Sequence, residues 1–390
     1  MTGAREGEQV QLQDLAVQDL AVVVVTSIPS PYQVEFFDML ARDGFRDFSA
    51  IYTKSDMGKR RWRRPQPRHR HLFMDGDNIG DACAWVDAAD LVVFSGYRGP
   101  FFTLLMRGRE AAVRPWALWA ERPGFRFKGS IGRLGRAILQ RRIRRHPIAI
   151  WGIGQWAVDG YRDEIAGERL YVDIPYFSNL DRFLGITRDD RQADTTRFLF
   201  SGEMSTRKGV DLLASAFVDL IRSGGDARLT FMGAGPLEQK VRRIVAPVAE
   251  RVDFAGFRQW HELPDVYRDH DVLVAPSRYD GWGLIVPEGL AAGMPVIGTA
   301  AMGSARDLVS QDAGWVVAED EIAPLAEAMH AVVGQSADAR AEMSRAARKA
   351  VQQVTLDAGV RRFVAAANST VADWRARCAA AEVAARARRT

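Results

Sequence analysis

Short aliphatic runs alternate with amphipathic stretches along most of the chain. Residues 20–25 are almost wholly aliphatic and are followed by Thr-Ser-Ile-Pro-Ser-Pro, which is typical of a buried strand that ends in a turn. The pattern predicts a helix over 133–145. Further strands are predicted in this half at 48–52, 91–94, 116–119 and 148–151. Because short buried strands alternate with helices, we expect a parallel sheet with right-handed crossovers.

A second alternating series follows a polar stretch at 181–196, which we interpret as a linker. It predicts strands at 197–201, 228–232, 252–254, 272–275 and 295–298, with helices at 209–222, 236–248, 262–268 and 285–292. We therefore expect a loose tail at 1–19, one domain at 20–180 and another at 197–355. Two doubly wound α/β units of this kind bind a ligand in the cleft between them, at the carboxyl ends of the strands.

Composition narrows the class of protein. The chain has 390 residues, of which 47% are hydrophobic and 26% are charged, so it is a folded globular protein and not a disordered one. Two cysteines, Cys83 and Cys378, exclude a disulfide framework and a four-thiolate zinc site. The longest aliphatic run has six residues, against about 20 for a membrane span. The first nineteen residues lack the features of a signal peptide, and we expect a cytoplasmic protein.

Two glycine-containing segments follow strands of the second half. In residues 201–209, Gly202 comes directly after a strand, and Arg207 and Lys208 precede a helix. Adjacent cations beside a helix start suit a diphosphate, although a solvated basic loop would have the same sequence. Residues 232–236, Met-Gly-Ala-Gly-Pro, are typical of a tight turn in which Gly233 could line the cleft.

A third segment, 276–290, carries two acids separated by seven residues, Asp280 before a predicted helix and Glu288 within it. A carboxylate in the loop can bind sugar hydroxyls, and one on the helix can chelate a ribose diol. Both acids could instead only stabilise the helix start through its dipole. A fourth segment, 293–299, predicts a turn and a buried strand at the same edge of the sheet.

These four segments, in this order, resemble the C-terminal domain of the retaining, nucleotide-sugar-dependent glycosyltransferases of family four, which have the GT-B fold. The resemblance covers about 195–320, and the first half resembles the family only loosely, mainly through residues 28–32. The family usually has Glu where this chain has Asp280, whose side chain is one methylene shorter. The identity of the sugar stays open for that reason.

The resemblance implies a role for each matching residue. Arg207 and Lys208 would neutralise the departing diphosphate, Glu288 would hold the ribose, and Asp280 would hold the donor sugar. The implied donor-binding set is Gly202, Glu203, Gly233, Phe257, Gly281, Trp282, Gly283 and Leu284. It also implies that a C-terminal helix at 356–390 packs back across the first domain, with Trp374 as an anchor.

The implied reaction is a retaining transfer from a nucleoside-diphosphate sugar to a saccharide, lipid-linked or small-molecule hydroxyl, in polysaccharide or glycoconjugate biosynthesis. No cofactor or metal is expected to be obligatory. A sugar-nucleotide epimerase or hydrolase with the same fold is the alternative. We find no strong candidate for a carboxylate nucleophile.

Acceptor residues are expected after strands of the first half. The candidates are Ser30, Tyr32, Tyr97 and Arg122. Glu121 follows the strand at 116–119 and could assist deprotonation of the acceptor, or could be a salt-bridged loop acid.

The first half also carries two basic segments. Residues 122–145 contain nine Lys and Arg residues and no acid, with Ile131, Leu134, Ile138, Leu139 and Ile143 close to one helical face. Residues 59–64 form the second. A basic amphipathic helix indicates binding to an anionic membrane surface, here the inner face of the membrane. The alternative is a solvated helix whose apolar side lies in the core.

Three other patterns are weaker. Gly152-Ile-Gly-Gln-Trp-Ala157 imitates a dinucleotide-binding fingerprint but lies late in its half. Asp75-Gly76-Asp77 imitates the metal motif of another glycosyltransferase fold, but its flanks are loop-like and we expect a surface turn. The basic segments could suggest a nucleic-acid-binding protein, but no recognition motif accompanies them.

Overall fold

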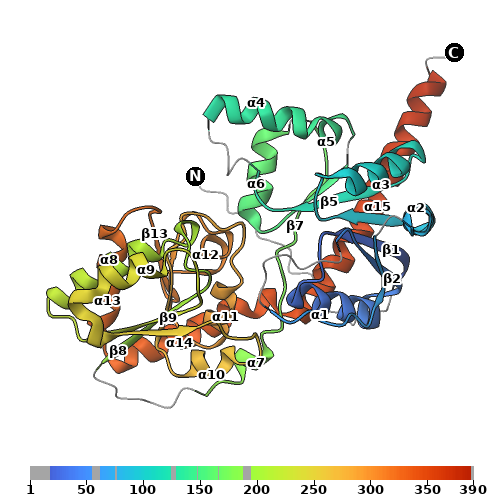
Figure 1. Cartoon of the computed structure of the whole chain (residues 1–390). Coiled ribbons are helices and arrows are strands. Elements are labelled where there is room, and N and C mark those ends of the chain that lie inside the picture. The colour runs from blue at the N-terminus through green and yellow to red at the C-terminus, as the bar shows by residue number, and fades with distance from the viewer. Residues whose placement is uncertain are drawn as a thin grey trace, which may run out of the picture.

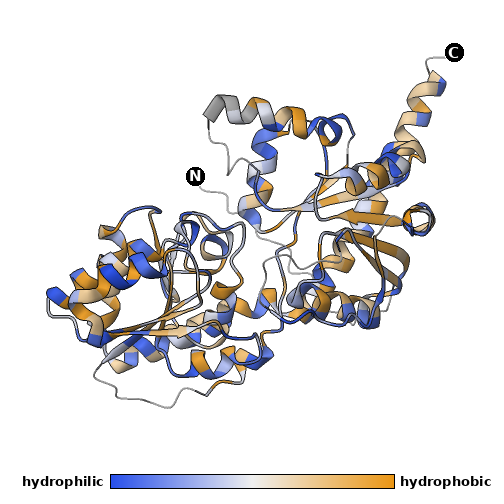
Figure 2. Cartoon of the chain, viewed as in Figure 1, coloured by the Kyte–Doolittle hydropathy of each residue, from blue (hydrophilic) through white to orange (hydrophobic). Residues whose placement is uncertain are grey.

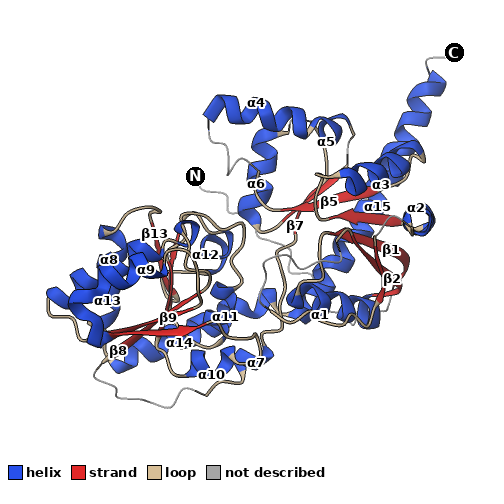
Figure 3. Ribbon diagram, in the orientation of Figure 1, coloured by secondary structure: helices blue, strands red, loops and turns tan. Residues whose placement is uncertain are grey.

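The computed structural model describes residues 18–54, 62–74, 77–123, 129–146, 148–165, 167–187 and 195–387. The described chain forms two parallel sheets, one with the strand order β3-β2-β1-β4-β5-β6-β7 and one with the order β10-β9-β8-β11-β12-β13 (Figure 1). Each group of strands is flanked by helices (Figure 3). The predicted fold class, two doubly wound α/β units, is confirmed.

The first sheet is built around β1, which pairs with β2 on one side and β4 on the other. Its strands are β1 Gln18–Thr26, β2 Phe45–Tyr52, β3 Arg70–Phe73, β4 Leu91–Phe94, β5 Trp116–Ala120, β6 Ala149–Gly152 and β7 Tyr171–Asp173. Its helices are α1 Pro31–Met39, α2 Ile79–Ala88, α3 Pro100–Ala111, α4 Gly129–Leu139, α5 Arg141–Arg145 and α6 Gln155–Glu164, and a π-helical turn at Leu40–Gly44 extends α1. The strands of this sheet are mostly hydrophobic, as expected for a sheet covered on both faces (Figure 2).

The helix predicted over 133–145 is two helices, α4 and α5, because the chain turns at Gln140. The edge strands β3 and β7 were not predicted. Both are short and partly exposed, so neither has the continuous apolar run that marks the central strands.

The second sheet repeats this arrangement. Its strands are β8 Thr196–Ser201, β9 Ala227–Met232, β10 Val252–Gly256, β11 Val272–Ala275, β12 Val296–Thr299 and β13 Gly314–Val317. Its helices are α8 Val210–Arg222, α9 Glu238–Val245, α10 Leu263–Arg268, α11 Ile285–Ala291, α12 Gly303–Leu308, α13 Ala323–Val333 and α14 Ala337–Ala350. The helix predicted at 236–248 is α-helical only over α9 and continues as a 3-10 helix, because Pro247 has no N–H for an α-helical hydrogen bond.

Part of the stretch predicted as a linker is structured. Asp181–Leu184 form the short helix α7, in which Phe183 is buried and its ring lies 5.0 Å from that of Tyr267. The Arg348 guanidinium donates to the Leu184 carbonyl at 2.7 Å. Residues 181–187 are therefore held against the second unit, while 188–194 lie outside the described residues.

The last helix, α15 Leu356–Ala387, runs back along the first sheet (Figure 1). Phe363 is fully buried, and its ring packs edge-on against Trp151 at 4.9 Å. Trp151 also donates to the Thr370 hydroxyl at 3.1 Å. Trp374 is only partly buried, so Phe363 and not Trp374 is the main anchor of this helix.

Candidate active site

The strongest cluster of predicted residues lies where the order of the second sheet reverses, between β8 and β11. Ligands of open α/β sheets bind at such switch points, because the loops after the two neighbouring strands run in opposite directions there and leave a crevice between them. A 3-10 turn, Thr206–Lys208, follows β8, and Asp280 follows β11. The Lys208 Nζ forms an ion pair with the Asp280 carboxylate, and the Arg207 guanidinium lies 3.5 Å from the same oxygen.

Burial separates the two cations of this cluster. The Lys208 and Asp280 side chains are 12% and 14% exposed, whereas Arg207 is 47% exposed. The Arg207 guanidinium donates a hydrogen bond of 3.1 Å to the Tyr279 carbonyl. Lys208 thus fixes the loop carboxylate, and Arg207 leaves a positive charge open to an arriving anion.

Glu288 lies on α11, the helix that follows the loop carrying Asp280. Burial raises its pKa to about 7, and the Tyr267 hydroxyl donates to its carboxylate at 3.3 Å. The Arg182 charge lowers the same pKa and the Glu35 charge raises it. A carboxyl group in this setting is poised between its neutral and charged forms near neutral pH.

The loop between Asp280 and α11 is fixed from within its own domain. The Ser304 hydroxyl donates to the carbonyls of Trp282 and Gly283 at 2.6 and 2.9 Å. The Trp282 side chain is 1% exposed, and its Nε1 has no hydrogen-bond partner among the described residues. Its indole therefore packs into protein, so a ligand contact here would come from the backbone of 281–283, as the resemblance implied.

Two of the remaining predicted donor residues, Gly202 and Gly233, lie against each other at the ends of their strands. A Cβ on Gly233 would lie 1.8 Å from the Gly202 carbonyl oxygen, so the ends of β8 and β9 touch and only glycine fits at 233. Gly233 also has φ +137°, which favours glycine. Glu203 and Phe257 are exposed on neighbouring loops, and Leu284 is the N-cap of α11.

Glu121 reaches this loop from the first unit. A Cβ on Gly281 would lie 2.1 Å from its carboxyl carbon, so the two are in direct contact. Burial raises the pKa of Glu121, and the nearby Asp280 carboxylate raises it further while Arg207 lowers it. The Tyr176 hydroxyl donates to Glu121 at 3.5 Å. Glu121 as a whole is thus an exposed residue of the first unit, but its carboxyl group lies directly against the loop carrying Asp280.

The predicted acceptor residues are divided in the structure. The Tyr32 ring lies 5.2 Å from that of Tyr176, which places it beside Glu121. Ser30 is buried at the start of α1, where its carbonyl accepts from Val34. Tyr97 packs against the apolar cluster of β4 and α3, and the Arg98 guanidinium lies 5.7 Å from its ring.

Arg122 has structural partners. Its guanidinium donates to the Trp156 carbonyl at 2.7 Å and lies 5.1 Å from the Trp156 ring. It also lies 3.9 Å from Asp163 on α6. These contacts fasten the loop after β5 to α6, and the acceptor role of Arg122 stays a prediction.

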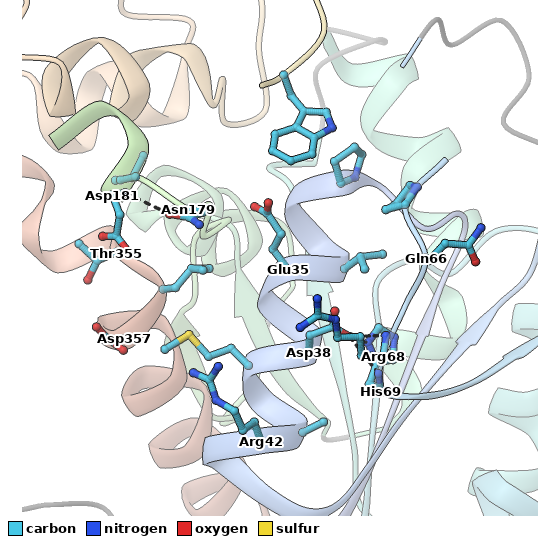
Figure 4. Close-up of a pocket in the computed structure, with 18 residues that line it drawn as sticks. Glu35, Asp38, Arg42, Gln66, Arg68, His69, Asn179, Asp181, Thr355 and Asp357 are labelled. Carbon is cyan, nitrogen blue, oxygen red and sulfur yellow. Dashed lines mark hydrogen bonds and ion pairs between the residues drawn. The ribbon is translucent and has the colours of Figure 1, made fainter. Parts of the chain in front are cut away.

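A cavity of about 1030 Å³ lies beside α1, between the two units, and none of the predicted site residues lines it. Figure 4 shows Glu35, Asp38 and Arg42 along one wall and Thr355 and Asp357 on the opposite one. Arg182 contacts two residues that line the cavity, because its guanidinium pairs with Glu35 at 2.7 Å and lies 4.5 Å from the Trp260 ring. Sequence reasoning missed Tyr176, Arg182 and Glu35, which reach the site only through contacts between distant segments.

The structure also bears on the alternative that the apolar side of the basic segment at 122–145 lies in the core. On α4, Leu134, Ile138 and Leu139 are 67%, 68% and 51% exposed, so they do not enter the core, whereas Ile143 on α5 is fully buried. Arg136 pairs with Glu164, and Arg142 with Glu110. Of the other basic segment, residues 59–61 lie outside the described residues.

The described part of the chain also bears on the possible metal motif and on a membrane span. No group of three or more His, Cys, Asp or Glu side chains is arranged there to hold a metal ion, and Asp75 and Gly76 lie outside that part. No helix of that part has the length and apolar character needed to cross a membrane.

Comparison with known proteins agrees with this geometry. Residues 195–335 match the family model of the glycosyl transferases group 1. A GDP-mannose-dependent monoacylated alpha-(1-6)-phosphatidylinositol monomannoside mannosyltransferase of Corynebacterium glutamicum is 26% identical over 204 residues, which are 48% of this chain and 53% of that protein. The lipopolysaccharide core biosynthesis mannosyltransferase LpsB of Rhizobium meliloti is 32% identical over 137 residues, 33% of this chain and 38% of that protein. The chain thus matches about half or less of the length of these two relatives.

Solved structures show the fold over nearly the whole chain. HepE of Anabaena in complex with UDP superposes with a TM-score of 0.69 at 13% identity, over 90% of this chain and all of that one (100%). Sucrose-phosphate synthase of Thermosynechococcus elongatus also has a TM-score of 0.69, at 18% identity and the same coverage of 90% and 100%. The predicted resemblance to GT-B glycosyltransferases is confirmed.

Proposed function

We propose that this chain, in which residues 195–335 form a group 1 glycosyl transferase domain within a GT-B fold, is a retaining glycosyltransferase. It would move a sugar from a nucleoside-diphosphate sugar to a hydroxyl of a saccharide, lipid-linked or small-molecule acceptor. The observation that carries this proposal is the cluster of Arg207, Lys208 and Asp280 at the switch point of the second sheet, with Glu288 on the adjacent helix.

A diphosphate fits this cluster for electrostatic reasons. Arg207 presents an exposed guanidinium, and Lys208 lies next to it with its charge shared by Asp280. Glu288 would accept hydrogen bonds from the two ribose hydroxyls. Structural neighbours bind UDP, and one relative is named as GDP-mannose-dependent, so both uridine and guanosine diphosphates belong in any donor panel.

The reaction would break the bond between the anomeric carbon and the diphosphate oxygen, and the diphosphate would leave with the electron pair. The two cations would stabilise the charge that develops on the leaving oxygen. The acceptor oxygen would bond to the same face of the sugar, which retains the configuration. Glu121, whose pKa is raised by burial and by Asp280, would accept the proton that the hydroxyl loses.

Thermal stabilisation by a panel of nucleoside diphosphates and their sugars, without added metal, tests the donor site. A nucleotide present at 100 times its dissociation constant should stabilise the protein by about 2.7 kcal/mol. The double variant Arg207→Ala/Lys208→Ala should lose this response. Lys240→Ala is the matched control, because Lys240 pairs with Asp211 outside the cluster.

Two results would count against the proposal. If the same nucleotide also stabilises the double variant, the diphosphate does not bind at this cluster. If no nucleotide stabilises wild type, the protein has no donor site. Consumption of a nucleotide sugar at full rate without any acceptor would favour the hydrolase or epimerase alternative.

We also propose that α4 rests on an anionic membrane surface during the reaction. Leu134, Ile138 and Leu139 are exposed on a helix whose neighbouring residues are rich in Arg, which is the composition of interfacial helices. A membrane-bound enzyme would suit a lipid-linked acceptor, and both mannosyltransferases compared above are named for lipid-containing substrates or products.

Flotation with vesicles tests this second proposal. The protein should float with vesicles rich in phosphatidylglycerol and not with pure phosphatidylcholine vesicles, and Leu134→Glu/Ile138→Glu should abolish flotation. Val383→Glu is the control, because Val383 is equally exposed, at 68%, on the distant α15. Equal flotation of the α4 variant and the control would overturn the assignment of this helix.

A further inference from the structure

The turn that imitates a dinucleotide fingerprint is occupied by the other half of the protein. Gly152 ends β6, Gly154 is the N-cap of α6, and its φ is +84°. A Cβ on Gly154 would lie 2.6 Å from Cζ3 of Trp282 and 2.6 Å from Oδ2 of Asp307. Both neighbours belong to the second unit, so the absence of a side chain at 154 creates a seat for them.

Trp282 belongs to the loop that carries Asp280. This loop meets the first unit at two points, since Glu121 presses on Gly281 and Gly154 receives the Trp282 ring. On the other side, the loop is tied to α12 through the Ser304 hydroxyl. The backbone of 281–283, which would contact the donor sugar, therefore lies between two surfaces that belong to different units.

Asp307 strengthens the same contact. Its carboxylate accepts the backbone N–H of Gln155 at 2.7 Å, at the first turn of α6. Arg306 lies over the Trp156 ring at 5.5 Å, so α12 and α6 meet through polar as well as aromatic groups (Figure 1). Because α12 also holds Ser304, a shift of α6 against α12 would displace the loop directly.

We propose that Gly154 is a positioning residue: it seats Trp282 so that the donor loop reaches its reactive geometry only when the two units are in contact. This proposal rests on the proposed function for the role of the loop. It predicts that a side chain at 154 slows transfer without weakening nucleotide binding, because Arg207, Lys208 and Glu288 all lie in the second unit. A displacement of about 1 Å at a reacting centre can cost about 100-fold in rate.

The chain provides a matched control for Gly154→Ala. Gly99 is also the N-cap of a helix, with φ +107° and ψ 161°, against φ +84° and ψ 159° at Gly154. A Cβ on Gly99 meets nothing within 4 Å. Gly99→Ala thus introduces similar backbone strain without the contact, so any further loss of thermal stability in Gly154→Ala comes from the contact with the second unit.

The experiment compares three readouts in wild type, Gly99→Ala and Gly154→Ala. We expect kcat to fall about tenfold or more only in Gly154→Ala. The dissociation constant for the nucleoside diphosphate should stay within twofold in all three proteins, and small-angle scattering should show a larger radius of gyration only for Gly154→Ala. Trp282→Phe in the Gly154→Ala background should restore part of kcat, because it removes the Trp282 ring atoms that the new methyl group meets and leaves only the contact with Asp307.

The outcomes separate this proposal from the proposed function. Equal kcat values and equal radii of gyration for Gly154→Ala and Gly99→Ala would overturn the positioning role of Gly154, even if the enzyme transfers sugar. A loss of nucleotide binding in Gly154→Ala alone would also overturn it, since the residue would then act on the nucleotide site. If wild type binds no nucleotide, the proposed function fails, while scattering still tests the contact between the units.

Discussion

The loops at the carboxyl ends of the second sheet carry short motifs of glycine and charged residues, whereas those of the first sheet carry scattered aromatic and polar side chains. The two sheets otherwise share the same strand order around β1 and β8. The family model matches residues 195–335 of the second unit. A donor diphosphate demands fixed charges at fixed spacing, while acceptors differ in shape. On the proposed function, the second unit has the more recognisable sequence because its ligand is constant.

The largest expected effect comes from the first unit. Glu121→Gln should lower kcat by about 100- to 10,000-fold, because the acceptor hydroxyl would lose its proton acceptor. Nucleotide binding should not change. Steady-state kinetics with a donor and acceptor pair would measure kcat, and Asp47→Asn, at an exposed carboxylate of β2 in the same unit, is the control. If Glu121→Gln keeps its full kcat, Glu121 is not the proton acceptor and the loop after β5 provides no catalytic group.

In the second unit, Glu288→Gln should change the pH dependence of stability. The folded pKa of Glu288, about 7, lies above its unfolded value near 4.5, so the stability that neutral Glu288 provides is present below pH 4.5 and lost as pH rises through 7. Glu288→Gln keeps a neutral group, so at pH 8 it should be more stable than wild type by up to about 3 kcal/mol. Denaturant unfolding at pH 4.5 and 8 measures the difference, and a constant difference at both pH values would refute it.

The same titration should appear in donor binding. The charged form of Glu288 accepts hydrogen bonds from ribose hydroxyls better than the neutral form. Affinity for a nucleotide sugar, whose diphosphate does not titrate in this range, should rise about tenfold between pH 6 and pH 8. Calorimetric titration of Glu288→Gln should give a flat profile. If wild type and the variant have parallel profiles, another group must hold the ribose.

The smallest effect tests the structural role of Arg122. Arg122→Ala removes the hydrogen bond to the Trp156 carbonyl and should destabilise the protein by about 1–2 kcal/mol. The acceptor KM should stay within twofold. Arg162→Ala, which removes a more exposed arginine of the same unit, is the control. A rise in acceptor KM without a loss of stability would support the predicted acceptor role.

The difference between the two units also explains which strands and which site residues could be predicted from the sequence. The limits of β4 and β11 agree with prediction, because both are uninterrupted apolar runs, and β13 was missed because its residues are partly exposed. The charged residues that we propose bind the donor lie in the loop after a strand or on the next helix, so local spacing identified them. Tyr176 and Asp307 were missed because each meets the site only across a contact between distant segments.

The pseudo-fingerprint at Gly152 shows the limit most clearly. Its glycines have the spacing of a phosphate-binding turn, yet a Cβ on Gly152 would clash with Val158 of α6, and Gly154 receives Trp282. Glycines that allow close approach look the same in a sequence whether the approaching group is a phosphate or another part of the chain. Only the folded structure distinguishes the two.

The central claim is that the second unit binds the nucleotide and the first completes the transfer. The most direct test is the dissociation constant for the nucleoside diphosphate that stabilises wild type best, measured for wild type, Glu121→Gln and Arg207→Ala/Lys208→Ala. We predict equal values for wild type and Glu121→Gln, and a value at least about 100-fold higher for the double variant. Tight binding by the double variant, or weak binding by Glu121→Gln, would contradict this division between the two units.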